Sequence, residues 1–140
     1  MNKLFLTMLA LFTLTCAIQC KKGEDTNLNE VSGNTATIKW QDCATFTDHN
    51  TTICIKEANE YRCPCLIDCI WEGAIDVTMN VQMSGVDSTI TLTTNSSPAN
   101  LNFSDTIGTK IIRFVKTNIQ SCEDYGKYEK YDFTVEVTNL

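Results

Sequence analysis

The stretch AIDVTMNVQMSGVDSTITLTT, residues 74–94, decides the fold class of this chain, because its apolar and polar residues alternate one by one. One face of its first half carries Ile75, Val77, Met79, Val81 and Met83. The residues between them are mostly polar, which is the pattern of a half-buried antiparallel strand. Residues 84–87 (SGVD) have the composition of a turn, and Ile90 and Leu92 continue the alternation beyond it. The stretch therefore predicts a β-hairpin with one buried face.

Further segments have the composition of strands. They lie at residues 35–40, 51–57, 109–119 and 130–140. A long polar loop that carries Cys122 joins the last two, which predicts a second hairpin. No segment keeps a helical period, although residues 57–62 are compatible with a single helical turn. The chain is therefore predicted to be all-β, as an antiparallel β-sandwich or barrel of about six to eight strands stapled by disulfides.

Residues 1–19 have the features of a secretory signal peptide. Lys3 is followed by an uncharged, apolar stretch up to Ile18, which is too short and wrongly flanked for a membrane-spanning helix. Cys20 comes next, and the charged run KKGED follows it at once. This abrupt switch resembles the processing site of bacterial lipoproteins, in particular surface-exported lipoproteins of the Bacteroidetes type.

The resemblance implies that Cys20 carries a diacylglycerol, is the first residue of the mature chain and receives a further acyl chain such as palmitate. Several acyl chains would anchor the protein stably to a membrane, here the outer membrane or the cell surface. Two alternatives stay open: Cys16 is the lipidated residue, or an ordinary signal peptide is removed and the product is periplasmic or secreted. Residues 20–34 would form a flexible tether, and residues 35–140 a single β domain.

The charge composition of the chain limits the classes of partner that it can bind. The chain has a formal net charge of −6, and removal of the signal peptide with Lys3 makes it one unit more negative. Its two arginines are Arg62 and Arg113. Such an acidic chain lacks the basic surface that nucleic acids require, so no nucleic-acid partner is expected. The membrane is expected as a partner through the lipid anchor, with a protein or small-molecule ligand unknown.

The remaining cysteines predict that the domain is held by disulfides. They are Cys43, Cys54, Cys63, Cys65, Cys69 and Cys122. An even number in an exported domain of this size predicts three bridges, although six cysteines allow about 15 pairings.

A second reading makes Cys63, Cys65 and Cys69 a zinc or copper site. Cys122 or His49 would supply the fourth ligand. The C-x-C spacing is tighter than structural zinc sites prefer, and an oxidising compartment competes for the thiols. A redox pair of Cys63 and Cys65 is less favoured still, because the C-x-x-C motif and its βαβ context are missing.

RCP at residues 62–64 and CIWEG at residues 69–73 together resemble a motif of the form R-C-P-(four residues)-C-[IV]-W-x-G. This motif is found in small exported bacterial domains of uncharacterised function, many of them lipoproteins. The resemblance covers most of residues 50–140 and implies a disulfide between Cys63 and Cys69. Cys65 is an addition to the motif. The cysteines outside the motif would pair among themselves, and we expect Cys43 with Cys54 and Cys65 with Cys122.

The leading functional prediction is a non-catalytic lipoprotein with a binding or structural role. The sequence does not place a nucleophile, a base and an acid together, so neither an enzyme nor a cofactor is expected. A ligand would contact the loops at residues 42–50, 95–106 and 120–129. One alternative is a metal-binding or metal-delivery protein that uses the cysteine cluster. Another is an exported hydrolase inhibitor that presents a disulfide-braced loop at residues 66–68 (Leu66, Ile67 and Asp68).

Other conspicuous residues have structural explanations. His49 is predicted to be a polar loop histidine, and Trp40 and Trp71 are predicted to pack in the core. A group of acidic residues could hold a cation but is predicted to form a solvated face. Its members are Glu57, Glu60, Asp68, Glu72 and Asp76.

Overall fold

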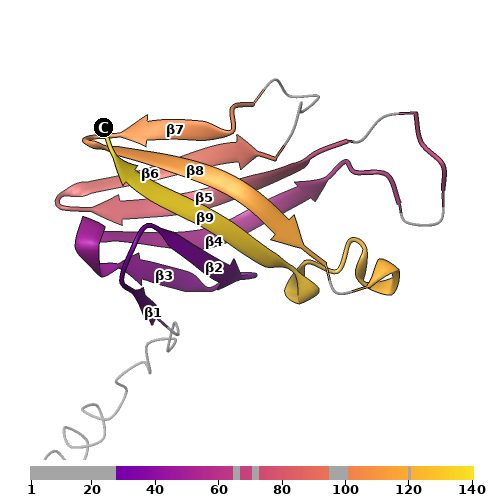
Figure 1. The fold of residues 1–140 in the computed structure, drawn as a ribbon, viewed down its shortest axis with the longest axis horizontal. Coiled ribbons are helices and arrows are strands. Elements are labelled where there is room, and N and C mark those ends of the chain that lie inside the picture. The colour runs from indigo at the N-terminus through magenta and orange to yellow at the C-terminus, as the bar shows by residue number, and fades with distance from the viewer. Residues whose placement is uncertain (1–27, 65–66, 71–72, 95–100, 120) are drawn as a thin grey trace, which may run out of the picture.

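The chain folds as a β-sandwich of two sheets (Figure 1). The computed structural model describes residues 28–64, 67–70, 73–94, 101–119 and 121–140. The five-stranded sheet has the order β1 (Leu28–Val31), β3 (Cys43–Phe46), β4 (Thr51–Glu60), β5 (Ile75–Met83) and β6 (Val86–Thr93). The four-stranded sheet has the order β2 (Thr35–Lys39), β9 (Asp132–Asn139), β8 (Lys110–Asn118) and β7 (Ser104–Ile107). The all-β class predicted from the sequence is confirmed, and of the two architectures considered the structure has the sandwich.

Three short 3₁₀ helices lie between strands of the described chain: η2 (Thr47–His49), η3 (Cys122–Asp124) and η4 (Tyr128–Lys130). η2 and the β5–β6 turn lie at one end of the sandwich, whereas η3, η4 and the connection between β4 and β5 lie at the other (Figure 1). We call the second end the arm end, because the connection at residues 61–74 projects from it. This connection carries Cys63 and Cys69 and is called the disulfide arm below.

The hairpin predicted from residues 74–94 is present as β5 and β6. Met83 pairs with Val86 across the turn, where Gly85 has a φ of +79° that other residues rarely adopt. The apolar face of β5 is fully buried at Ile75, Val77, Met79 and Val81. Each such side chain stabilises the fold by about 1.5–3 kcal/mol relative to an exposed one. The alternation in the sequence is therefore the alternation of the inner and outer faces of the sheet.

A β-bulge in β4 explains one wrong expectation from the sequence. The pairing of β4 with β5 shifts between Ile55 and Glu57, so that Ile55 and Ala58 are both buried although they are three residues apart. An extra residue in a bulge changes which side chains face the core. Three-residue spacing imitates a helical period, and the single helical turn proposed for residues 57–62 is wrong: β4 continues to Glu60.

The second predicted hairpin is present as β8 and β9, which pair along their whole length. β8 also contains a bulge, after Phe114, and Val115 is left exposed. Aromatic rings from the four-stranded sheet fill the core between the sheets: Phe114 and Phe133 lie 6.4 Å apart and Tyr131 and Phe133 6.1 Å apart. Trp40 is half-buried against Phe133, so it packs at the edge of this core as expected.

Strands also occur where the sequence predicts tether or loop. Leu28–Val31, within the predicted tether, form β1 and pair in parallel with β3. The predicted loops at 42–50 and 95–106 contain β3 and the first part of β7. These strands have four residues each, too few for an alternation to be recognised. The signal peptide, Cys20 and Trp71 lie outside the described residues.

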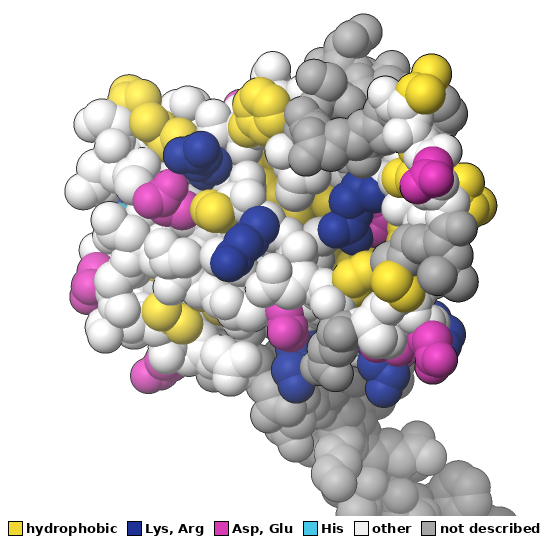
Figure 2. All heavy atoms as spheres, turned by 45° about the vertical axis from the view of Figure 1, so that its right-hand side comes forward, with side chains coloured by type: hydrophobic (Ala, Val, Ile, Leu, Met, Phe, Trp, Pro, Cys, Tyr) yellow, Lys and Arg dark blue, Asp and Glu magenta, His cyan; other side chains and the backbone are white. Residues whose placement is uncertain are grey.

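On the face seen in Figure 2, Lys and Arg side chains are interspersed with Asp and Glu, and hydrophobic side chains form small separate patches. No helix in the described ranges is both long and apolar enough to span a bilayer.

Candidate functional site

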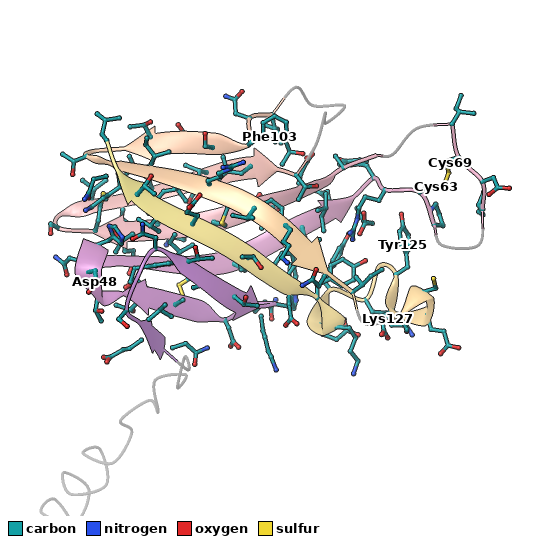
Figure 3. All side chains as sticks on the ribbon, viewed as in Figure 1. Asp48, Cys63, Cys69, Phe103, Tyr125 and Lys127 are labelled. Atoms are coloured by element: carbon teal, nitrogen blue, oxygen red, sulfur yellow. A yellow bond between two sulfur atoms is a disulfide. The ribbon has the colours of Figure 1, made fainter. Side chains whose placement is uncertain are left out.

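Two disulfides staple the five-stranded sheet and the arm. Cys43 on β3 is bonded to Cys54 on β4, at positions that are direct partners in the sheet. Cys63 is bonded to Cys69 within the disulfide arm, which extends past the ends of the strands (Figure 3). Both pairs are among those expected from the sequence. Cys65 lies outside the described residues, so its pairing with Cys122 stays a prediction.

The base of the arm is held by a cluster around Glu60, the last residue of β4. Arg62 donates hydrogen bonds from Nε to Glu60 Oε1 (2.7 Å) and from Nη2 to Oε2 (2.5 Å). Its backbone N–H also donates to Oε1 (3.0 Å). Tyr131 donates its hydroxyl to Oε2 (3.0 Å) and accepts a hydrogen bond from the N–H of Gly126 (2.7 Å). We call Glu60, Arg62, Gly126 and Tyr131 the Glu60 cluster.

Burial and charge shift the pKa values of Arg62 and Tyr131 in this cluster. The Glu60 side chain is only 4% exposed, so its charge needs the partners that Arg62 and Tyr131 provide. The hydrogen bonds to Glu60 raise the pKa of Arg62 above its usual value, although burial opposes them. Burial raises the pKa of Tyr131 to about 12, against the opposing hydrogen bond from Gly126. The phenol therefore keeps its proton and donates a hydrogen bond to the carboxylate.

The Glu60 cluster connects the disulfide arm to the connection between β8 and β9. Tyr128 in η4 accepts a hydrogen bond from the backbone N–H of Glu60 (3.2 Å), and Tyr125 donates its hydroxyl to the carbonyl of Arg62. Figure 3 shows Tyr125 between the Cys63–Cys69 bond and the sandwich. Since the carboxylate is buried and saturated by these partners, the cluster is suited to holding the arm and the β8–β9 connection in place.

Beyond its base the arm is exposed. Ile67 is 61% exposed and Ile70 98% exposed. The N–H of Ile67 donates to the carbonyl of Pro64 (3.1 Å). Leu66, the first residue of the loop in the hydrolase-inhibitor alternative, lies outside the described residues, so that alternative stays a prediction.

A groove lies at the opposite end, on the outer face of the five-stranded sheet. It has a volume of about 390 Å³, within the usual range for small-molecule sites. Its polar lining consists of Thr45, Asn50, Thr52, Gln82, Ser84 and Asp87. Met83, Gly85 and Val86 complete it. The groove is therefore built from the outer faces of four strands and from the β5–β6 turn.

The sheet register brings these polar residues together. Thr45 on β3 pairs with Thr52 on β4, Thr52 with Gln82 on β5, and Gln82 with Asp87 on β6. They form a row straight across adjacent strands. The hydroxyls of Thr45 and Thr52 lie 3.0 Å apart, and Gln82 Nε2 donates to Asp87 Oδ2 (3.3 Å).

One side of the groove is closed by Asn50, which follows η2. Its backbone is left-handed, with a φ of +49°, and its Nδ2 donates to Ser84 Oγ in the β5–β6 turn (2.8 Å). Left-handed backbone is uncommon for residues other than glycine, but asparagine tolerates it better than most. This bond ties the start of β4 to the turn and fixes the shape of the groove.

His49, expected from the sequence to be a polar loop histidine, lies in η2 and is only 8% exposed. Its Nε2 bonds to Asn34 Oδ1 (2.8 Å), and Lys110 Nζ donates to its Nδ1 (3.5 Å). Lys110 also donates to Asn139 Oδ1 (2.5 Å). His49 therefore links η2 to the β1–β2 connection and to the start of β8 in the four-stranded sheet.

The structure does not bring the proposed metal ligands together as thiols. Cys63 and Cys69 are bonded to each other, which removes two of the three thiolates that the metal alternative requires. Within the described ranges no three His, Cys, Asp or Glu side chains are placed to hold a metal ion. The expectation of a solvated acidic face is wrong for Glu60 and Asp76, which are buried.

Sequence reasoning missed the groove. Thr52 and Gln82 are visible in the sequence as outward polar positions of predicted strands, but Thr45 lies on a strand that was not predicted. The sequence shows Thr52 and Gln82 as the polar residues of an alternating pattern. Only the pairing register of the strands shows that these residues form one row.

The chain matches no family model, no curated protein and no solved structure.

Proposed function

We propose that this chain is an exported, lipid-anchored domain with a non-catalytic binding role. The observation that carries the binding role is the groove on the five-stranded sheet. Its side chains are held by hydrogen bonds to one another, which favours a pre-formed site. A site of this kind captures a ligand without changing it.

Export is supported by the large contribution that the disulfides make to the stability of the fold. On the chain-entropy account, bridges that close loops as short as those of Cys43–Cys54 and Cys63–Cys69 stabilise a fold by about 2–3 kcal/mol each. The net stability of a domain is on the order of 5–15 kcal/mol, so these bonds are a large part of it. Such bonds form and persist in an oxidising compartment. The signal peptide pattern agrees with that location.

The anchor rests on Cys20 and the charged run that follows it. Lipid on Cys20 would hold the domain at a membrane through the segment that precedes β1. β1 forms one edge of the sheet that carries the groove, so the outer face of that sheet would be presented beside the tether.

Replacement of the anchoring cysteine tests this proposal. We expect Cys20→Ser to move the protein from the membrane pellet to the soluble fraction of the producing bacterium. Cys16→Ser is the matched control and should leave the protein in the pellet. Membrane retention of Cys20→Ser would contradict the anchor, and release by Cys16→Ser alone would place the lipid on Cys16.

A further inference from the structure

We infer that the groove on the five-stranded sheet binds a neutral oligosaccharide. The inference deepens the binding role proposed above and rests on it, but it does not depend on the lipid anchor. It is carried by the chemistry of the groove's side chains, by their charge and by the way they are held.

The lining offers both donors and acceptors. The hydroxyls of Thr45, Thr52 and Ser84 can each donate one hydrogen bond and accept two, and the amides of Asn50 and Gln82 do both. The contacts among these side chains use only part of that capacity. A sugar hydroxyl also donates and accepts. A polyhydroxylated ligand therefore matches such a lining more fully than a ligand that only donates or only accepts.

The charge of the lining disfavours other classes of ligand. Among the described residues that line the groove, Asp87 is the one with a formal charge. Anionic ligands such as phosphates are held by Arg, Lys or clustered backbone N–H groups, and no Arg or Lys is among those lining residues. A single carboxylate is also a poor cage for a hard cation, which takes several oxygen ligands. A lone carboxylate can instead accept hydrogen bonds from neutral hydroxyls.

The polar row is also long enough for an oligosaccharide. Met83 and Val86 line the end of the groove, but the alternation of a strand turns their side chains to the face opposite Gln82 and Asp87. Because adjacent strands lie about 4.8 Å apart, the row from Thr45 to Asp87 spans roughly 14 Å. That length accommodates more than one sugar ring.

A second Thr pair provides a matched control outside the groove. Thr78 on β5 and Thr91 on β6 also face each other on this sheet, with their hydroxyls 2.9 Å apart. Neither residue lines the groove. Removing hydroxyls from this pair changes the same sheet by the same chemistry without touching the proposed site.

The test uses the full mature protein, as the cell produces it, in a detergent without a sugar headgroup. It is screened on an array of neutral and acidic oligosaccharides, and the tightest neutral hit is titrated by calorimetry. We expect binding of a neutral oligosaccharide. The variant Thr52→Val/Gln82→Leu should weaken it about tenfold or more, the loss of one to two hydrogen bonds. The control Thr78→Val/Thr91→Val should change the affinity less than about twofold.

Three outcomes would overturn the inference: no neutral oligosaccharide is retained, only acidic ones are, or both double variants weaken binding alike. Urea unfolding of both variants shows that each is folded under the assay conditions. The anchor is scored separately by membrane fractionation, so a failed saccharide screen and a failed anchor are distinguishable.

Discussion

Gly73→Ala is expected to lower the free energy of unfolding by about 2–5 kcal/mol. Gly73 ends the disulfide arm with a φ of +74°, and an added Cβ would lie 2.2 Å from the carbonyl oxygen of Tyr61 and 2.5 Å from Cα of Arg62. The left-handed backbone alone costs a residue with a side chain roughly 1–2 kcal/mol. The clash with backbone atoms adds the cost of overpacking, about 1–3 kcal/mol. Urea unfolding with the disulfides intact measures the sum.

Gly126→Ala separates these two contributions. Gly126 has a φ of +75°, almost the same as that of Gly73, but no atom lies within 4 Å of the position that its Cβ would take. We expect this variant to lose only the roughly 1–2 kcal/mol that left-handed backbone costs. Equal losses of unfolding free energy in the two variants would mean that the close approach of Gly73 to Tyr61 and Arg62 adds nothing to the cost of the Gly73 substitution.

Glu60→Ala is expected to destabilise the protein by about 3 kcal/mol. The substitution removes the acceptor of both Arg62 side-chain donors, of the Arg62 backbone N–H and of the Tyr131 hydroxyl. Breaking a buried ion pair from one side costs about 3–5 kcal/mol. The lower end of that range applies because Arg62 is 25% exposed and can regain some water. The loss should appear as a fall of about 10 °C or more in Tm.

Glu136→Ala is the matched control for this result. Glu136 pairs with Arg113 at 3.9 Å, but the two side chains are 33% and 60% exposed. Exposed pairs of this kind contribute about 0–1 kcal/mol. A Glu60→Ala loss no larger than that of Glu136→Ala would show that the Glu60 cluster does not hold the arm end.

The longer strands were predictable because each has enough residues for an alternation to be counted. The β5–β6 hairpin and the β8–β9 pair follow directly from the apolar residues at every second position. The strands of four residues could not be predicted, because β1, β3 and β7 are too short to show an alternation and are recognised only by their pairing with neighbouring strands. The bulge in β4 explains why the helical turn predicted for residues 57–62 is wrong. It changes the spacing of the buried residues at Ile55 and Ala58, although the chain stays in the sheet.

The sites were less predictable than the fold. The cysteine spacing directed attention to the arm, and the structure does place the Cys63–Cys69 bond there. The role of Glu60 could not be read from the sequence, because its partner Tyr131 is 71 residues away. The groove depends in the same way on the alignment of four strands, of which one was missed. The loops expected from the sequence to bind a ligand do not lie together. Residues 47–50 and residues 121–129 are at opposite ends of the sandwich (Figure 1).

The most direct test of the central claim is the intact mass of the protein purified from its own cell envelope, alkylated without prior reduction. An exported, lipid-anchored and disulfide-stapled domain predicts an acyl mass on Cys20. It also predicts that no alkyl group is added and that two hydrogens are lost for each disulfide, Cys43–Cys54 and Cys63–Cys69 among them. A mature chain without lipid, or alkyl groups on Cys63 and Cys69, would contradict the account.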